Sequence, residues 1–211
     1  MPEVYLYHGL SEIAIGSEDN AIISLQELVQ YPQEIKSVQY GLVTLGYIYS
    51  KEKRWEDIKL LYKNRSFLNF SNDWWLDITL YRAEANWQLG DLERAEKDFS
   101  FVLSQPNATK EMIDLSLKRL FSIAQNKRDL ELMEKLANQA EKIFPDRSAD
   151  LINYWLRLGI QNYVERKLHD SLYYFRKIYN NENRDSAGDI SALYLAEIEV
   201  NMLDQGNILK S

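Results

Sequence analysis

Few side chains in this sequence could form a metal or catalytic centre. His8 and His169 are the only imidazoles, and the chain has no cysteine. Histidine ligands for zinc come in characteristic close spacings, whereas these two residues lie far apart along the chain. Without cysteine, the chain forms no disulfide, no thiolate nucleophile and no Cys-bound zinc or iron–sulfur site. We therefore expect no metal site.

Carboxylates are plentiful, but no pair of them stands out as an acid–base pair. Asp91, Glu93, Glu96 and Asp98 are close in sequence, and on an exposed helix such residues act as solvated charges and local ion pairs. General acid–base catalysis by a pair of carboxylates stays open as an alternative. The 8 glycines stand singly, so the chain has no phosphate-binding loop, dinucleotide-binding motif or nucleophile elbow. We expect no cofactor and no enzymatic activity.

The charge balance limits the partners that the chain is expected to bind. Among 211 residues, 25 are Lys or Arg and 32 are Asp or Glu, which gives a net charge of −7. An acidic chain is a poor general ligand for nucleic acid and for anionic membrane surfaces. No apolar run approaches the roughly 20 residues that span a bilayer, and we see no signal peptide at the start. We expect no nucleic-acid partner and no direct membrane insertion, with cytoplasm and periplasm both allowed.

The sequence contains a repeat of 37 or 38 residues, and the helices of this repeat would position any functional site. Only 4 Pro and 8 Gly are present, which favours helices over a β-sandwich or barrel. A first series of positions recurs in steps of 37, 37, 38, 38 and 37 residues: Gly9, Gly46, Ala83, Phe121, Gly159 and Ala196. A second series follows 12 residues behind its partner each time: Ala21, Ile58, Ala95, Met133 and Ser171. This spacing indicates rigid helical hairpins joined by connectors of slightly variable length.

Apolar residues around both series follow helical steps of three, four and seven. Turn signals, such as Gly90-Asp91, separate the two helices of each hairpin, and Pro- or Asn-containing breaks close each repeat. We predict eleven helices, over about 3–15, 18–30, 36–50, 54–67, 73–89, 92–104, 110–126, 129–143, 148–164, 168–180 and 187–203. They form five hairpins and a half repeat in one domain, 1–211, with repeats over about 2–34, 35–72, 73–109, 110–147, 148–186 and 187–211.

The repeat resembles the tetratricopeptide repeat. The segment WQLGDLERAEKDF at 87–99 matches it best, with five residues at the family spacing: Gly90, Asp91, Leu92, Ala95 and Phe99. The first-helix pattern is matched by Leu42, Leu45, Gly46 and Tyr49 and by Trp155, Leu158 and Gly159, and the closing proline by Pro32, Pro106 and Pro145. The chain departs from the family in its period, which is 34 residues there, and in placing His8, Glu12 and Arg82 at positions that the family keeps apolar.

The resemblance implies an all-α fold, a right-handed α-solenoid of antiparallel hairpins whose first helices line a concave face. On that face we predict a binding site for a peptide or another protein, since aromatic residues there anchor interfaces. The expected partner-binding residues are Tyr40, Val43, Tyr47, Leu80, Glu84, Trp87, Lys118, Gln125, Leu156 and Tyr163. The alternative for each is that it packs against the next repeat. Only Lys118 fits the basic clamp with which some relatives hold a terminal carboxylate, so we do not expect that ligand.

The final helix, 187–203, carries apolar residues all round, such as Leu193, Ile198 and Val200. Two explanations stay open: the chain is a piece of a longer array, or this helix buries its outer face in a homodimer. The leading functional hypothesis is a non-catalytic scaffold for protein–protein interaction. The alternative is a self-assembling structural scaffold, which predicts a mass that depends on concentration.

Overall fold

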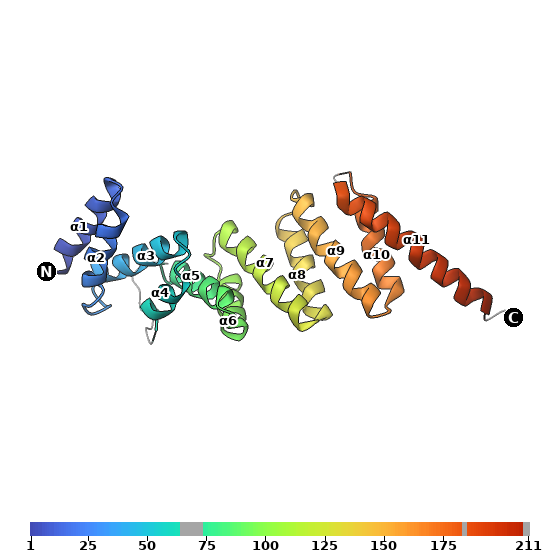
Figure 1. The fold of residues 1–211 in the computed structure, drawn as a ribbon, viewed down its shortest axis with the longest axis horizontal. Helices are drawn as coiled ribbons and strands as arrows, with labels where there is room; N and C mark the ends of the chain where they lie inside the picture. Colours follow the sequence, from blue (N-terminus) through green and yellow to red (C-terminus); the bar gives the residue numbers. More distant parts are fainter. Residues whose placement is uncertain (64–73, 183–184, 209–211) are drawn as a thin grey trace. The chain divides into compact units, whose positions relative to one another are not determined.

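The computed structural model describes residues 1–63, 74–182 and 185–208. Within these residues the fold is entirely helical, as expected (Figure 1). The helices are α1 (Pro2–Ala14), α2 (Glu18–Leu28), α3 (Lys36–Lys51), α4 (Trp55–Leu61), α5 (Trp74–Gln88), α6 (Leu92–Leu103), α7 (Lys110–Lys127), α8 (Leu130–Ile143), α9 (Ser148–Val164), α10 (Leu168–Tyr179) and α11 (Asp185–Ile208).

Most helix ends lie within two residues of their predicted positions, and two helices differ by more. α4 ends at Leu61 where the sequence predicts a helix to 67, and the rest of that prediction lies largely outside the described residues. α11 runs from Asp185 to Ile208, beyond both ends of the predicted 187–203. The sequence after residue 203 has no proline and only one glycine, so nothing in it forces the helix to stop there.

The chain divides into two compact units, Met1–Arg119 and Leu120–Ser211. In the first unit, each helix of α1 to α5 packs against the next, and the first helices also pack on one another, α1 on α3 and α3 on α5. In the second unit, α8 to α11 follow the same rule, and α9 packs on α11. This nearest-neighbour packing is that of a helical repeat protein. The superhelical hand that the resemblance implies stays a prediction.

The five hairpin turns share one backbone geometry. One residue just beyond each first helix has a positive φ: Gly16 at 80°, Lys53 at 58°, Gly90 at 80°, Arg128 at 57° and Arg166 at 62°. In each turn the next residue donates its N–H to the carbonyl five positions earlier, as from Asp91 to Asn86 at 2.8 Å. This is the bonding of a Schellman motif, which satisfies carbonyls at a helix end. The turns that the sequence predicts at these positions are confirmed.

Glycines on three first helices let the second helix of the same hairpin approach closely. A methyl group added to Gly9 would lie 2.9 Å from Leu25, and one added to Gly159 would lie 2.7 Å from the Phe175 ring. A methyl group on Gly46 would overlap the hydroxyl of Tyr62. The glycines of the first series therefore mark the contact between the two helices of a hairpin.

Each unit has its own apolar core. In the first unit, the fully buried side chains include Leu25, Leu42, Leu45 and Ile58, around which other residues of α2 to α5 pack. In the second unit, Phe121 and Phe175 are almost completely buried, along with Ile123, Leu158 and Ile178. No helix among the described residues is long and apolar enough to cross a bilayer.

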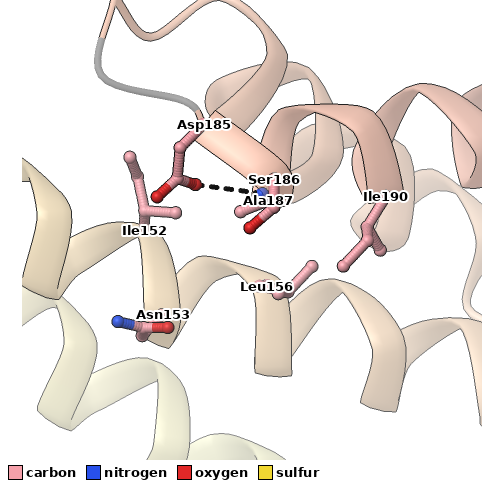
Figure 2. A pocket seen from close by; sticks show the side chains of 7 residues that line it. All are labelled: Ile152, Asn153, Leu156, Asp185, Ser186, Ala187 and Ile190. Carbon is pink, nitrogen blue, oxygen red and sulfur yellow. Dashed lines mark hydrogen bonds between the residues drawn. The ribbon is translucent and has the colours of Figure 1, made fainter.

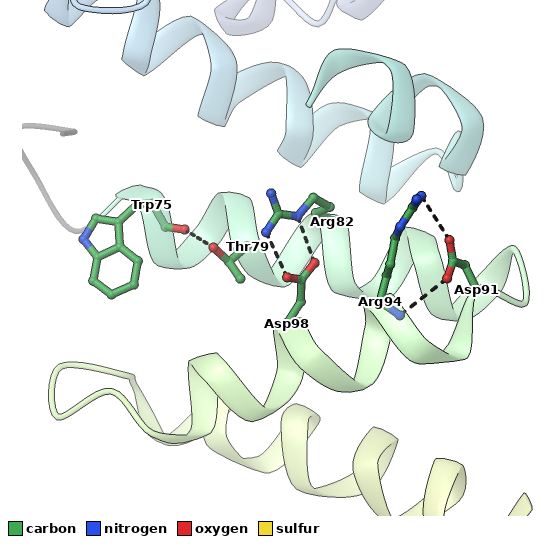
Figure 3. Close-up of polar contacts among 6 residues, drawn as sticks. All are labelled: Trp75, Thr79, Arg82, Asp91, Arg94 and Asp98. Atoms are coloured by element: carbon green, nitrogen blue, oxygen red, sulfur yellow. Dashed lines mark hydrogen bonds and ion pairs between the residues drawn. The ribbon is translucent and has the colours of Figure 1, made fainter. Parts of the chain in front are cut away.

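Two residues that depart from the family pattern have polar partners on the second helix of their hairpin. Arg82 on α5 donates to both carboxylate oxygens of Asp98 on α6, each at 2.8 Å (Figure 3). His8 Nδ1 on α1 lies 2.6 Å from the Ser24 hydroxyl on α2. Figure 3 also shows Asp91 at the start of α6, where its carboxylate accepts from the Arg94 N–H and caps the helix.

Candidate interaction surfaces on the first helices

The first unit exposes aromatic residues on α3. Tyr47 is 57% exposed and Tyr40 is 37% exposed. Val43, between them on the same helix face, is partly buried and packs on the core. The rings of Tyr40 and Trp74 on α5 pack edge to face, with 5.3 Å between ring centres. Of the predicted residues in this unit, the two tyrosines on α3 therefore keep the most surface free for a partner.

Glu84 and Trp87 on α5 are already engaged by a neighbouring first helix. Arg119 on α7 donates to both carboxylate oxygens of Glu84, at 2.8 and 2.6 Å. Its guanidinium carbon lies 3.8 Å from the centre of the Trp87 ring, which is a close cation–π contact. Lys118, next to Arg119, forms an ion pair with Asp114 at 3.0 Å. Leu80 is half-buried on α5.

Asp77 on α5 is a half-buried carboxylate in the first unit. Burial raises the pKa of Asp77 above its ordinary value, and the hydrogen bond from its own backbone N–H only partly offsets this effect. Burial also raises the pKa of Tyr81, one turn further along α5, to about 12, with a smaller contribution from the charge of Asp77. Among the described residues, no basic side chain forms an ion pair with Asp77.

In the second unit, a hollow of about 140 Å³ opens between α9 and the start of α11 (Figure 2). Its lining mixes apolar and polar side chains, and the predicted residue Leu156 is among them: Ile152, Asn153, Leu156, Asp185, Ser186, Ala187 and Ile190. Asp185 accepts a hydrogen bond from the Ala187 N–H at 3.1 Å, which holds its carboxylate beside the hollow. The hollow offers both an apolar wall and hydrogen-bonding groups to a ligand.

Gln125 and Tyr163 contact the next first helix in the second unit. Arg157 on α9 donates to the Gln125 side chain at 2.9 Å. The Tyr163 hydroxyl donates to Glu197 on α11 at 2.5 Å, and this hydrogen bond raises the pKa of Tyr163. The rings of Tyr163 and Tyr194 also pack edge to face, with 5.1 Å between ring centres. These contacts are of the kind that the sequence leaves open as the alternative to partner binding.

Among the α11 side chains that the structure describes, three large apolar ones are exposed: Leu193 at 72%, Val200 at 57% and Ile190 at 39%. Leu193 and Val200 are seven residues apart and share one face of the helix. The exposed Glu197 lies between them, and its carboxylate accepts the hydrogen bond from Tyr163. In the register of the repeat, Leu193 and Val200 correspond to Leu156 and Tyr163 on α9, each 37 residues earlier. The exposed apolar face of α11 thus continues the series of first-helix positions that the sequence predicts for binding.

The sequence analysis does not predict several residues of these surfaces. They occupy the same position in the repeat as a residue that it does predict. Tyr40 was predicted, and its counterparts one, three and four periods later are Asp77, Asn153 and Ile190. The last two line the hollow. Arg119 was also missed, and no pattern in the sequence marks it, because its partner Glu84 lies 35 residues earlier.

Among the described residues, no three His, Asp or Glu side chains come together in a way that could hold a metal ion. His8 lies on α1 in the first unit and His169 on α10 in the second. Comparison of the chain with protein-family models, with curated proteins and with solved structures found no match.

Proposed function

We propose that the chain is a non-catalytic scaffold of the tetratricopeptide type, which binds a peptide or a partner protein on the face formed by its first helices. The observation that carries this proposal is the apolar face of α11, where Leu193 and Val200 are 72% and 57% exposed. This face adjoins a hollow that offers both apolar and hydrogen-bonding groups. Exposed apolar side chains grouped beside a hollow are typical of interaction sites.

The tetratricopeptide assignment rests on the recurring hairpin. All five turns place a positive φ and the same carbonyl–amide hydrogen bond at the same point of the repeat. The small residues of the first series lie against the second helix, as they do at Gly9, Gly46 and Gly159. A regular stack of such hairpins favours binding over catalysis, because it builds an extended surface in preference to an enclosed site.

Selection of peptide ligands, followed by mutation of α11, tests this function. Peptides would be selected from a random displayed library on the immobilised chain, and their affinities measured by calorimetry. We expect Leu193→Asp to lower the affinity of the chain for the selected peptides by about tenfold or more, because it replaces the most exposed of these apolar side chains with a charge. Ile23→Asp is the matched control, since Ile23 is a 60% exposed apolar residue on the second helix α2. Equal affinities for both variants would contradict the proposed surface.

The same side chains favour a second candidate, self-assembly through α11. Ile190, Leu193 and Val200 form an exposed apolar stripe that a second copy of the chain would cover. In that case Leu193→Asp lowers the mass of the chain in solution, whereas in the first case it lowers peptide affinity at unchanged mass. Measuring both properties on this variant separates the two candidates.

A further inference from the structure

Three side chains on α5 lie along the face that packs on α3. Trp74, Asp77 and Tyr81 are spaced by three and four residues, so they share one stripe of the helix. The stripe touches α3 at both ends: Trp74 meets the Tyr40 ring at 5.3 Å, and a methyl group on Gly46 would lie 2.8 Å from the Tyr81 ring. Asp77 therefore sits between two aromatic contacts, in the seam of α3 and α5.

Among the residues that the structure describes, no cation forms an ion pair with the carboxylate of Asp77. The nearby ion pairs on α5 connect Arg82 with Asp98 and Arg119 with Glu84, and neither involves Asp77. Its environment disfavours the charged form, since burial raises the pKa of Asp77. A half-buried carboxylate without a counter-charge is unfavourable in the free protein, and a bound cation would remove that cost.

The register of the repeat places Asp77 at a surface position. Its counterparts on the other first helices are Glu3 on α1, Tyr40 on α3, Leu115 on α7, Asn153 on α9 and Ile190 on α11. Asn153 and Ile190 line the hollow of the second unit, and Tyr40 is exposed. The other carboxylate at this position, Glu3, is exposed, so the half-buried setting of the carboxylate is particular to Asp77.

We propose that Asp77, together with the rings of Tyr40, Trp74 and Tyr81, binds a lysine or arginine side chain of the partner. The apolar stem of that side chain lies against the aromatic rings while its charged end pairs with the carboxylate. This inference rests on the proposed function, because it names the chemistry of a partner that binds the first-helix face. A net charge of −7 on the chain also favours a basic partner.

A small cation tests the site without any partner. The full chain is titrated with n-butylammonium chloride, and in parallel with n-butanol at matched ionic strength, while NMR spectra follow the Trp74 indole N–H. We expect saturable shifts with butylammonium and markedly weaker ones with butanol. Asp77→Asn should weaken butylammonium binding by about fivefold. Asp19→Asn on α2 removes the same charge from an exposed residue, and should leave the binding unchanged.

Equal shifts with butylammonium and butanol would overturn the inference, as would equal effects of the Asp77 and Asp19 variants. If Asp77→Asn alters the spectrum beyond the site, the wild-type carboxyl resonance of Asp77 provides a second readout. Butylammonium should then lower the pKa of Asp77, and an unchanged pKa would overturn the inference. The probe acts in the first unit and the Leu193 test acts in the second, so failure of the site is distinguishable from failure of the proposed function.

Discussion

The contact between Arg82 and Asp98 occupies a place where other hairpins of the same chain use apolar residues. One period earlier the two positions hold Leu45 and Leu61, and one period later Leu120 and Leu136. Asp98 is only 8% exposed, and Arg82 meets it with two hydrogen bonds. The repeat thus tolerates either an apolar or an ionic contact here, provided that both partners change together.

Replacing one partner of this ion pair should be more destabilising than replacing both. Arg82→Leu alone leaves a buried carboxylate without its counter-charge, and we expect it to lower the free energy of unfolding by about 2 kcal/mol. The double variant with Asp98→Leu recreates the pair found in neighbouring hairpins, and should lie within about 1 kcal/mol of the wild type. Urea unfolding measures both values. An additive double variant would show that the two side chains do not act as a pair.

The exposed ion pair of the same hairpin is the control. Arg94 meets Asp91 at 3.3 Å, but its side chain is 69% exposed (Figure 3). Exposed pairs contribute little to stability, so Arg94→Leu should change the free energy of unfolding by less than about 0.5 kcal/mol.

Burial of Asp77 gives a stability that depends on pH with a defined sign. Because the pKa of Asp77 is raised in the folded chain, the folded state holds this proton to higher pH than the unfolded state does. The free energy of unfolding therefore falls as the pH rises from the pKa of Asp77 in the unfolded chain to its pKa in the folded chain. Above the folded pKa, the charge of Asp77 lowers the free energy of unfolding by a constant amount. Asp77→Asn should stabilise the chain at neutral pH, and the gain should vanish in acid.

Thermal unfolding of the wild type and Asp77→Asn between pH 3 and pH 7 measures this difference. A gain that stays constant over the whole range would mean that the charge of Asp77 is not its cause. A gain confined to neutral pH is also the expected mark of a binding residue, since such residues are often kept at a cost in stability.

At the scale of the element, different residues adopt the same backbone geometry in the hairpin turns. Gly16 and Gly90 have φ of 80° at the turn, and the same place holds Lys53, Arg128 and Arg166 with φ near 60°. The left-handed conformation is costly for residues with a Cβ atom and not for glycine. Three of the five turns therefore store local strain that their neighbours lack.

Glycine substitutions should release this strain. We expect Lys53→Gly, Arg128→Gly and Arg166→Gly each to stabilise the chain by about 0.5 kcal/mol, the relief of strain exceeding the added freedom of the unfolded chain. Gly90→Ala should destabilise it by about 1 kcal/mol for the opposite reason. Melting temperatures of the four variants test the assignment. Destabilisation by all three glycine substitutions would mean that these long side chains make contacts worth more than the strain.

At the scale of the whole molecule, the open question is whether α11 meets a second copy. Light scattering over a range of concentrations measures the mass of the chain in solution. If the stripe of Ile190, Leu193 and Val200 pairs with itself, the mass rises with concentration, and removal of residues 187–211 abolishes the rise. A constant monomer mass would exclude self-assembly through α11 and leave the peptide-binding hypothesis as the leading one.

The sequence by itself determined the helices and the hairpin turns. The signals for these features each act over a few neighbouring residues. They are apolar residues three and four apart, helix-capping residues such as Asp91 and Asp129, and turn residues at one place in the repeat. The structure contains a helix for each predicted one, and places the five turns where the sequence does. Such features are local, and the propensities of neighbouring residues specify them independently of contacts that are distant in sequence.

The tertiary structure alone decided which first-helix residues are free. Glu84, Gln125 and Tyr163 were predicted as binding residues, and each bonds to a side chain 32 to 35 positions later: Arg119, Arg157 and Glu197. Tyr47 keeps an exposed position, Leu156 lines the hollow, and Asp77 is a half-buried carboxylate. The physical reason is that these contacts depend on how consecutive first helices are staggered and rotated within each unit, and the length of the repeat does not specify either quantity.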